Sequence, residues 1–169
     1  MSLKPSLTGL DQARIIERDE HPISRKQITP NALKVLYRFK EAGFHAFLVG
    51  GGVRDLMLGN KPKDFDIATN ATPEEIKRLF KNARIIGRRF KIVHIRFGRE
   101  IIEVTTFRAH HDPQNEIADD ASRRQIRGLD SAHSSSGMIL RDNVYGDIDQ
   151  DALQRDFTVN ALYYTVDHF

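Results

Sequence analysis

The chain has 169 residues, no cysteine and no tryptophan, with 40% hydrophobic and 29% charged residues. This length suits one domain, and the lack of cysteine excludes disulfides, thiolate zinc sites and cysteine nucleophiles. No apolar run approaches the roughly 18 residues of a membrane span, and the N-terminal segment lacks the apolar core of a signal peptide. The composition therefore predicts a soluble cytoplasmic protein.

The formal net charge of +3 averages two regions of opposite sign. Residues 77–108 contain ten basic and two acidic side chains, whereas residues 109–151 contain four basic and nine acidic ones. A basic block inside a folded pattern indicates a polyanionic partner such as a nucleotide or RNA. A solvated surface would carry the same charges, so charge alone leaves both interpretations open.

The first folded element is expected after an N-terminal arm. Residues 1–28 show no sustained periodicity, which predicts a flexible arm. Thr29 is a suitable N-cap, and Pro30 is a suitable first residue, for a helix that ends near Gly43. We therefore expect the folded domain over residues 29–169.

Five short apolar or alternating runs predict the strands of one sheet. They cover residues 45–49, 64–68, 84–86, 91–97 and 100–107. A helix is predicted over residues 53–58, and the capping box at residues 72–75 predicts the start of another. Gly98 and Arg99 predict a tight hairpin turn. The pattern corresponds to an α+β fold, with a mixed sheet of about five strands and helices packed on it.

The C-terminal third is predicted to be less regular. Residues 109–137 contain few large apolar side chains and many Ser, Asp and Gly, which predicts a long mobile loop. A helix is expected to start within residues 149–157. The apolar run at residues 161–166 predicts either its continuation or a final strand.

Two carboxylates, Asp64 and Asp66, carry the strongest local chemical signal. On a strand, residues i and i+2 point to the same face, so both would project together while Phe65 turns into the core. Neighbouring carboxylates repel each other, and Mg²⁺ removes that repulsion while it binds substrate phosphates. A solvated acidic turn explains the pair equally well when it is taken alone.

A glycine-rich turn lies upstream of this pair, between a predicted strand and a predicted helix. Gly50 and Gly51 would let phosphate oxygens approach backbone N–H groups, and Arg54 would add a charged fork. The turn is neither a dinucleotide-binding fingerprint nor a Walker A loop, and a plain tight turn remains the alternative. Together with Asp64 and Asp66, and with Glu103 on a later strand, the turn suits a two-metal site for a triphosphate.

Several ordered motifs together resemble the head of the class II nucleotidyltransferases, the group of bacterial poly(A) polymerases and CCA-adding tRNA nucleotidyltransferases. The motifs are LVGGGVRDLMLGNKPKDFDIATNATPEEI and DQDALQRDFTVNALYY. The resemblance covers about residues 30–169. The stretches GRRFKIVHIRFG, IIEVTTFRAHH and GMILRDNVYGDI are more similar to bacterial poly(A) polymerase I than to a CCA-adding enzyme.

The resemblance implies a polymerase-β-like palm that transfers AMP from ATP to an RNA 3′-hydroxyl and releases pyrophosphate. Asp64 and Asp66 would bind two Mg²⁺ ions. Glu103 is our candidate for a third metal carboxylate, and Asp156 competes with it for a catalytic role.

The resemblance also implies a set of nucleotide contacts. The residues concerned are Gly50, Gly51, Arg54, Arg155 and Asn160. Gln154 stands where the family commonly has a second arginine. The phosphate contact of that arginine would then be missing, or would come from Arg88 or Arg89.

The chain stops at Phe169, before the neck, body and tail regions with which this family reads the base and grips RNA. We therefore expect a catalytic head with little activity of its own, whose partners are ATP and RNA 3′ ends. Its oligomeric state stays open. The alternatives are the head of a CCA-adding enzyme and a non-catalytic nucleotide- or RNA-binding remnant.

Overall fold

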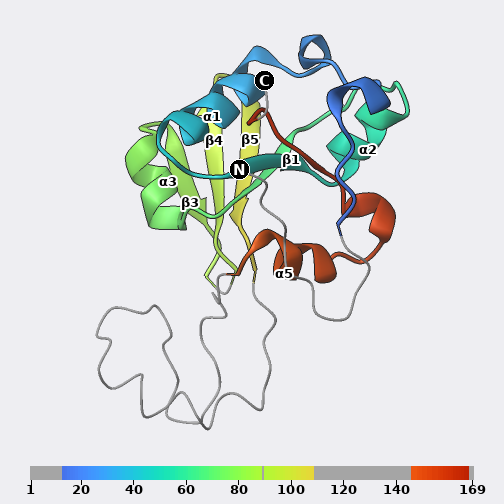
Figure 1. The fold of residues 1–169 in the computed structure, drawn as a ribbon. Helices are drawn as coiled ribbons and strands as arrows, with labels where there is room; N and C mark the ends of the chain where they lie inside the picture. Colours follow the sequence, from blue (N-terminus) through green and yellow to red (C-terminus); the bar gives the residue numbers. More distant parts are fainter. Residues whose placement is uncertain (1–12, 89, 109–145, 168–169) are drawn as a thin grey trace, which may run out of the picture.

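The computed structural model describes residues 13–88, 90–108 and 146–167, which form one sheet with helices packed against it (Figure 1). The helices are α1 (Pro30–Glu41), α2 (Gly51–Met57), α3 (Pro73–Leu79) and α5 (Ile148–Leu153). The strands are β1 (Ala46–Val49), β2 (Asp66–Thr69), β3 (Ala83–Ile86), β4 (Ile92–Phe97), β5 (Glu100–Thr106) and β6 (Tyr163–Tyr164). Short 3-10 turns occupy Arg18–Glu20, Arg25–Gln27 and Thr158–Asn160.

The sheet has six strands in the order β3-β4-β5-β2-β1-β6. The β2–β5 pair is parallel, and the other pairs are antiparallel. This confirms the predicted mixed sheet and adds one strand to the expected five. The sixth strand is β6, so the final-strand alternative for residues 161–166 is the one that the structure adopts.

Local signals explain where the first helices begin and end. The Thr29 hydroxyl accepts a hydrogen bond from the backbone N of Ala32 at 3.3 Å, as expected of the N-cap of α1. Thr72 caps α3, and the Glu75 carboxylate accepts a hydrogen bond from the backbone N of Thr72 at 2.8 Å, which completes the predicted capping box. Gly98, at φ +60°, forms the predicted turn between β4 and β5.

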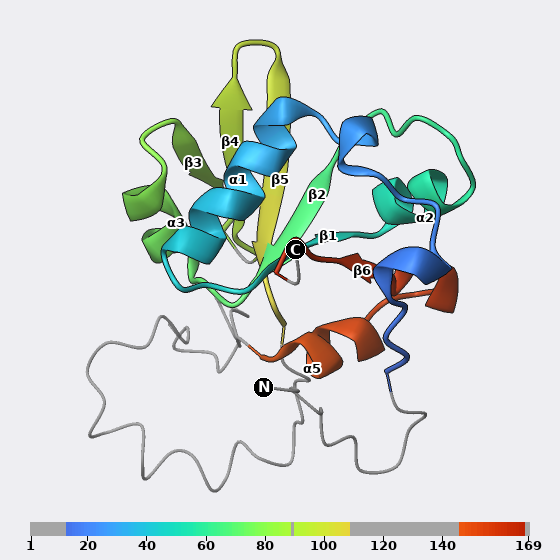
Figure 2. The same ribbon diagram turned by 45° about the horizontal axis from the view of Figure 1, so that its top comes forward.

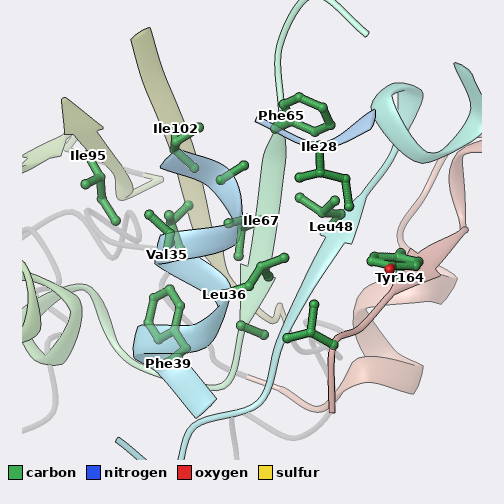
Figure 3. Packing of buried hydrophobic residues seen from close by; sticks show 14 of the residues in the cluster. Ile28, Val35, Leu36, Phe39, Leu48, Phe65, Ile67, Ile95, Ile102 and Tyr164 are labelled. Carbon is green, nitrogen blue, oxygen red and sulfur yellow. The ribbon is translucent and has the colours of Figure 1, made fainter. Parts of the chain in front are cut away.

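The main core lies between the sheet and helices α1 and α3. Figure 3 shows Val35, Leu36 and Phe39 of α1 next to Leu48 and Ile67 of the sheet. Alternate residues of each strand supply this core, so their neighbours in sequence point to the other face. That second face carries Asp66 and Glu103, and we call it the carboxylate face.

Helix α5 covers only part of the carboxylate face. Its Ile148 packs against a second, smaller cluster that includes Val49, Ala68 and Phe107. Figure 2 shows α5 and α1 well apart, with the sheet strands running between them. The covered part belongs to β1 and β2, and the β3–β4–β5 part carries exposed side chains.

Two predictions are corrected or fall outside the description. Of the flexible arm expected over residues 1–28, residues 1–12 lie outside the described residues, while Ile23 and Ile28 are 2% and 4% exposed and belong to the main core. The packed part of the chain therefore begins before residue 29. The whole of the loop expected over residues 109–137 lies outside the described residues. In the part of the chain that is described, no helix is long and apolar enough to cross a membrane.

Candidate active site

A row of paired residues crosses the carboxylate face. The ladder places Val49 opposite Asp66, Asp66 opposite Glu103, and Glu103 opposite His94, while His94 in turn pairs with Arg84. Residues that pair directly project from the same face of a sheet. The register therefore brings Asp66 and Glu103 together, although 36 residues separate them along the chain.

The charges around Asp66 show that the predicted carboxylates converge. Its side chain reaches solvent, but the surrounding protein raises the pKa of this carboxyl, first by desolvation and then by the negative charges of Glu103 and Asp64. The positive charge of Arg155 acts in the opposite direction. Glu103 also contacts His94, with 3.5 Å between its Oε2 and the histidine Nε2.

Asp64 contributes in a slightly different way from the prediction. Strand β2 begins at Asp66, so Asp64 lies just before the strand and not on it. Phe65 is buried in the main core, as predicted, and Asp64 is exposed. The two carboxylates still interact through their charges, although strict alternation along a strand does not place them.

Two glycines of the turn after β1 approach the rest of the site, each in a different way. Gly50 has φ +70°, a left-handed conformation that favours glycine, and a Cβ built there would lie 3.7 Å from Nη1 of Arg155. A Cβ on Gly52 would lie 3.2 Å from the carbonyl oxygen of Asp64. The third glycine thus lets the turn approach the backbone of Asp64, a role that differs from the phosphate approach proposed for these glycines.

Arg54 and Asn160 link the glycine turn to the C-terminal segment. The Nη1 of Arg54 donates to Oδ1 of Asn160 at 3.3 Å, and Nδ2 of Asn160 donates to Oδ1 of Asp156 at 3.2 Å. The hydrogen bond from Asn160 lowers the pKa of Asp156. Asp156 therefore belongs to the Arg54 side of the site, whereas Glu103 is the carboxylate paired with Asp66.

Sequence reasoning missed the group that supports Arg155. Asp151 is 6% exposed; its Oδ2 accepts hydrogen bonds from Tyr163 Oη at 2.6 Å and from Arg155 Nη2 at 3.1 Å. Arg155 also lies over the Tyr163 ring, 5.6 Å from its centroid. Burial disfavours the charged guanidinium, but these polar contacts outweigh it, and the pKa of Arg155 is raised. The i,i+4 spacing of Asp151 and Arg155 was the available signal.

The chemistry of the donor set fits Mg²⁺. Asp66, Glu103 and Asp64 offer hard oxygen ligands whose mutual repulsion a divalent cation would relieve. Within residues 13–88, 90–108 and 146–167, no three His, Cys, Asp or Glu side chains form a ready-made metal cluster. Mg²⁺ commonly binds to one or two carboxylates together with substrate phosphates, which this arrangement allows. Arg89, one of two proposed substitutes for the missing arginine, lies outside the described residues, and Arg88 is exposed.

Comparisons with known proteins agree with the fold and the motifs. Poly(A) polymerase I of Escherichia coli O157:H7 is 54% identical over 158 residues, which are 94% of this chain and 32% of that protein. A CCA-adding enzyme of Staphylococcus aureus strain Newman is 33% identical over 137 residues, or 81% of this chain and 29% of the enzyme. The chain thus spans about a third of the length of these relatives.

A solved structure supports the same grouping. The Bacillus stearothermophilus CCA-adding enzyme in complex with CTP is similar at a TM-score of 0.54 and 29% identity, over 80% of this chain and 28% of that one. This confirms the α+β nucleotidyltransferase fold that the motifs imply. The sequence profile of the Poly A polymerase head domain matches residues 46–169. The chain therefore belongs to the poly A polymerase head-domain family.

Proposed function

We propose that this chain is the catalytic head of an enzyme that transfers AMP from ATP to the 3′-hydroxyl of RNA and releases pyrophosphate. One observation carries the proposal: the register pairs Asp66 with Glu103, and the charges of Asp64 and Arg155 act on the same carboxyl. Carboxylates facing a cation beside a glycine turn suit phosphoryl chemistry. The identity of 54% to a poly(A) polymerase, against 33% to a CCA-adding enzyme, favours adenylation of RNA.

Each side chain has a role in this proposal. Asp64, Asp66 and Glu103 would hold two Mg²⁺ ions. These ions would lower the pKa of the attacking hydroxyl and stabilise the leaving pyrophosphate. Arg155 and Arg54, on either side of the turn at Gly50 and Gly51, bind and orient the triphosphate. We expect an enzyme that consumes ATP and RNA ends to work in the cytoplasm.

Asp156 and Asn160 act at a different point of the site. Their mutual hydrogen bond orients the Asn160 amide, which also accepts from Arg54. We assign both to contacts with the nucleotide and not to the metal ions. The exposed side of this segment leaves room for the sugar.

The decisive experiment is a nucleotide and RNA specificity assay of the full-length protein. The expected result is repeated addition of AMP to unstructured RNA, with little incorporation of CTP. Addition of CCA to tRNA that lacks this end, without tailing of other RNA, would instead establish the CCA-adding alternative. Binding of ATP and Mg²⁺ without turnover would establish the non-catalytic remnant.

The same assay tests the carboxylates. Asp64→Ala and Asp66→Ala are each expected to reduce transfer by at least about 1,000-fold while the circular dichroism spectrum stays unchanged. Glu41→Ala is the matched control, because Glu41 is an exposed carboxylate at the end of α1. Near wild-type tailing by either aspartate variant would contradict the proposed mechanism.

A further inference from the structure

The carboxylate face continues beyond the catalytic carboxylates as an exposed surface. From Asp66 the register leads through Glu103 and His94 to Arg84 on β3. Arg84 is exposed, and so is Arg96, which lies on the same face of β4. Among the described residues neither arginine has a salt-bridge partner. Arg84 and Arg96 therefore lie next to the proposed reaction centre on the same face of the sheet.

Exposed apolar side chains flank these two cations on the same face. Ile86 and Ile101 are 44% and 37% exposed, which is unusual for isoleucines on a sheet. Arg96 pairs with Ile101, and Ile86 pairs with Ile92, so arginines and isoleucines interleave on β3, β4 and β5. Alternation of cationic and apolar side chains suits a single-stranded nucleic acid, whose phosphates and bases need contacts of both kinds.

The covered and exposed parts of the carboxylate face indicate in which direction a nucleic acid strand could leave the active site. On the β1–β2 side, Ile148 of α5 packs over Ala68 and Phe107, so a polymer cannot continue there. On the β3–β4 side the described part of the chain leaves Arg84, Ile86 and Arg96 exposed. Three strand spacings separate Asp66 from Arg84, about 14 Å, which is the reach of a few nucleotides.

We propose that the last few nucleotides of the RNA lie across β5, β4 and β3. The 3′-hydroxyl is at Asp66 and Glu103, and upstream phosphates contact Arg84 and Arg96. Ile86 and Ile101 support the bases, and His94 lies between the two groups. This inference rests on the proposed function, since it places the RNA of that reaction. It also gives a role to Arg84 and Arg96, two members of the basic block at residues 77–108.

Binding of RNA without turnover tests the placement. The full-length protein would be titrated with a fluorescent single-stranded oligoadenylate, without ATP or Mg²⁺, over a range of salt concentrations. Arg84→Ala/Arg96→Ala is expected to weaken binding by about tenfold or more and to reduce the slope of log K against log salt by about 1.4, the value for two phosphate contacts.

The matched control is Lys77→Ala/Arg78→Ala. These exposed cations lie on α3, which covers the opposite face, so the variant removes the same charge without touching the proposed path. We expect the control to bind oligoadenylate within about twofold of the wild type. Equal losses in the two double variants would overturn the proposal, because net charge alone would then explain the binding.

A second measurement separates RNA from nucleotide. Equilibrium binding of ATP is expected to be unchanged in Arg84→Ala/Arg96→Ala. Weakened ATP binding with intact oligoadenylate binding would overturn the inference and assign this surface to the triphosphate. Both measurements report binding and not catalysis, so they test the RNA path even if the full-length protein transfers no AMP. Absence of transfer by the wild-type protein would count against the proposed function and not against the RNA path.

Discussion

The two sides of the candidate site are positioned by different means. Asp66 and Glu103 stand on β2 and β5, and the hydrogen-bonded ladder between these strands sets their separation. Arg155, Asp156 and Asn160 belong to a segment of short helical turns that side-chain hydrogen bonds hold in place. The carboxylates therefore depend on the fold as a whole, whereas the cations and amides depend on a few replaceable contacts.

The strongest test of this comparison neutralises, one at a time, the two candidates for the third metal-binding carboxylate, Glu103 and Asp156. Glu103→Gln removes the charge next to Asp66, and we expect AMP transfer to fall by about 1,000-fold or more. Asp156→Asn alters a group on the nucleotide side, and we expect a fall of about tenfold, mainly in KM for ATP. Steady-state kinetics of both variants would decide it, and the reverse order would assign the metal role to Asp156.

Among the contacts that hold the segment of Arg155, Asp156 and Asn160, we expect those of Asp151 to matter most for stability. Asp151→Ala leaves the Arg155 guanidinium and the Tyr163 hydroxyl without their shared partner, and we expect a loss of about 3 kcal/mol in unfolding free energy. Transfer should fall as well, with a rise in KM for ATP because Arg155 loses its orientation. Urea denaturation provides the first measurement. Asp149→Ala on the same helix is the control, expected to stay within about 0.5 kcal/mol of wild type.

Gly52→Ala probes the contact between the two sides. The new Cβ would press on the carbonyl of Asp64, so we expect transfer to fall about tenfold with a stability change below about 1 kcal/mol. Gly59→Ala should show the opposite profile, because Gly59 has φ +76° with open space around it. That variant is expected to lose about 1 kcal/mol of stability and to retain activity. Similar profiles for the two variants would contradict the steric argument.

The smallest expected effect is the loss of unfolding free energy caused by the charge of Asp66. The folded protein raises the pKa of Asp66, so folding becomes less favourable as pH rises from the unfolded value of 3.8 through the raised folded value. Asp66→Asn should therefore be slightly more stable than wild type at neutral pH in metal-free buffer. The difference should shrink as pH falls toward 3.8. Thermal melts across that range would show it, and a constant difference would exclude titration of Asp66 as its cause.

Much of the fold could be predicted because its signals are local. The N-cap at Thr29, the capping box at Thr72 and the turn at Gly98 each act within a few residues, and the structure confirms all three. The docking of Ile23 and Ile28 could not be predicted, since it depends on a distant apolar surface and not on periodicity within the segment.

The residues of the candidate site also divide into those that local motifs identify and those whose contacts depend on distant parts of the chain. The motifs identified Asp66 and Glu103, but only the strand register shows that they pair. The group of Asp151, Arg155 and Tyr163 was missed as a unit, because Tyr163 reaches Asp151 through the pairing of β6 with β1. His94 was missed for a similar reason, since its contact with Glu103 depends on the hairpin register.

The parallel β2–β5 pair has a consequence for how the protein acquires its site during synthesis. Between these strands the chain forms α3, β3 and β4, so the pairing closes a long loop, whereas β4 and β5 pair through a tight turn. Closure of long loops is slow compared with hairpin formation. We therefore expect a nascent chain to complete its hairpin first and to gain affinity for divalent cations only when β5 docks beside β2. Cation affinity would then report the last step of sheet assembly.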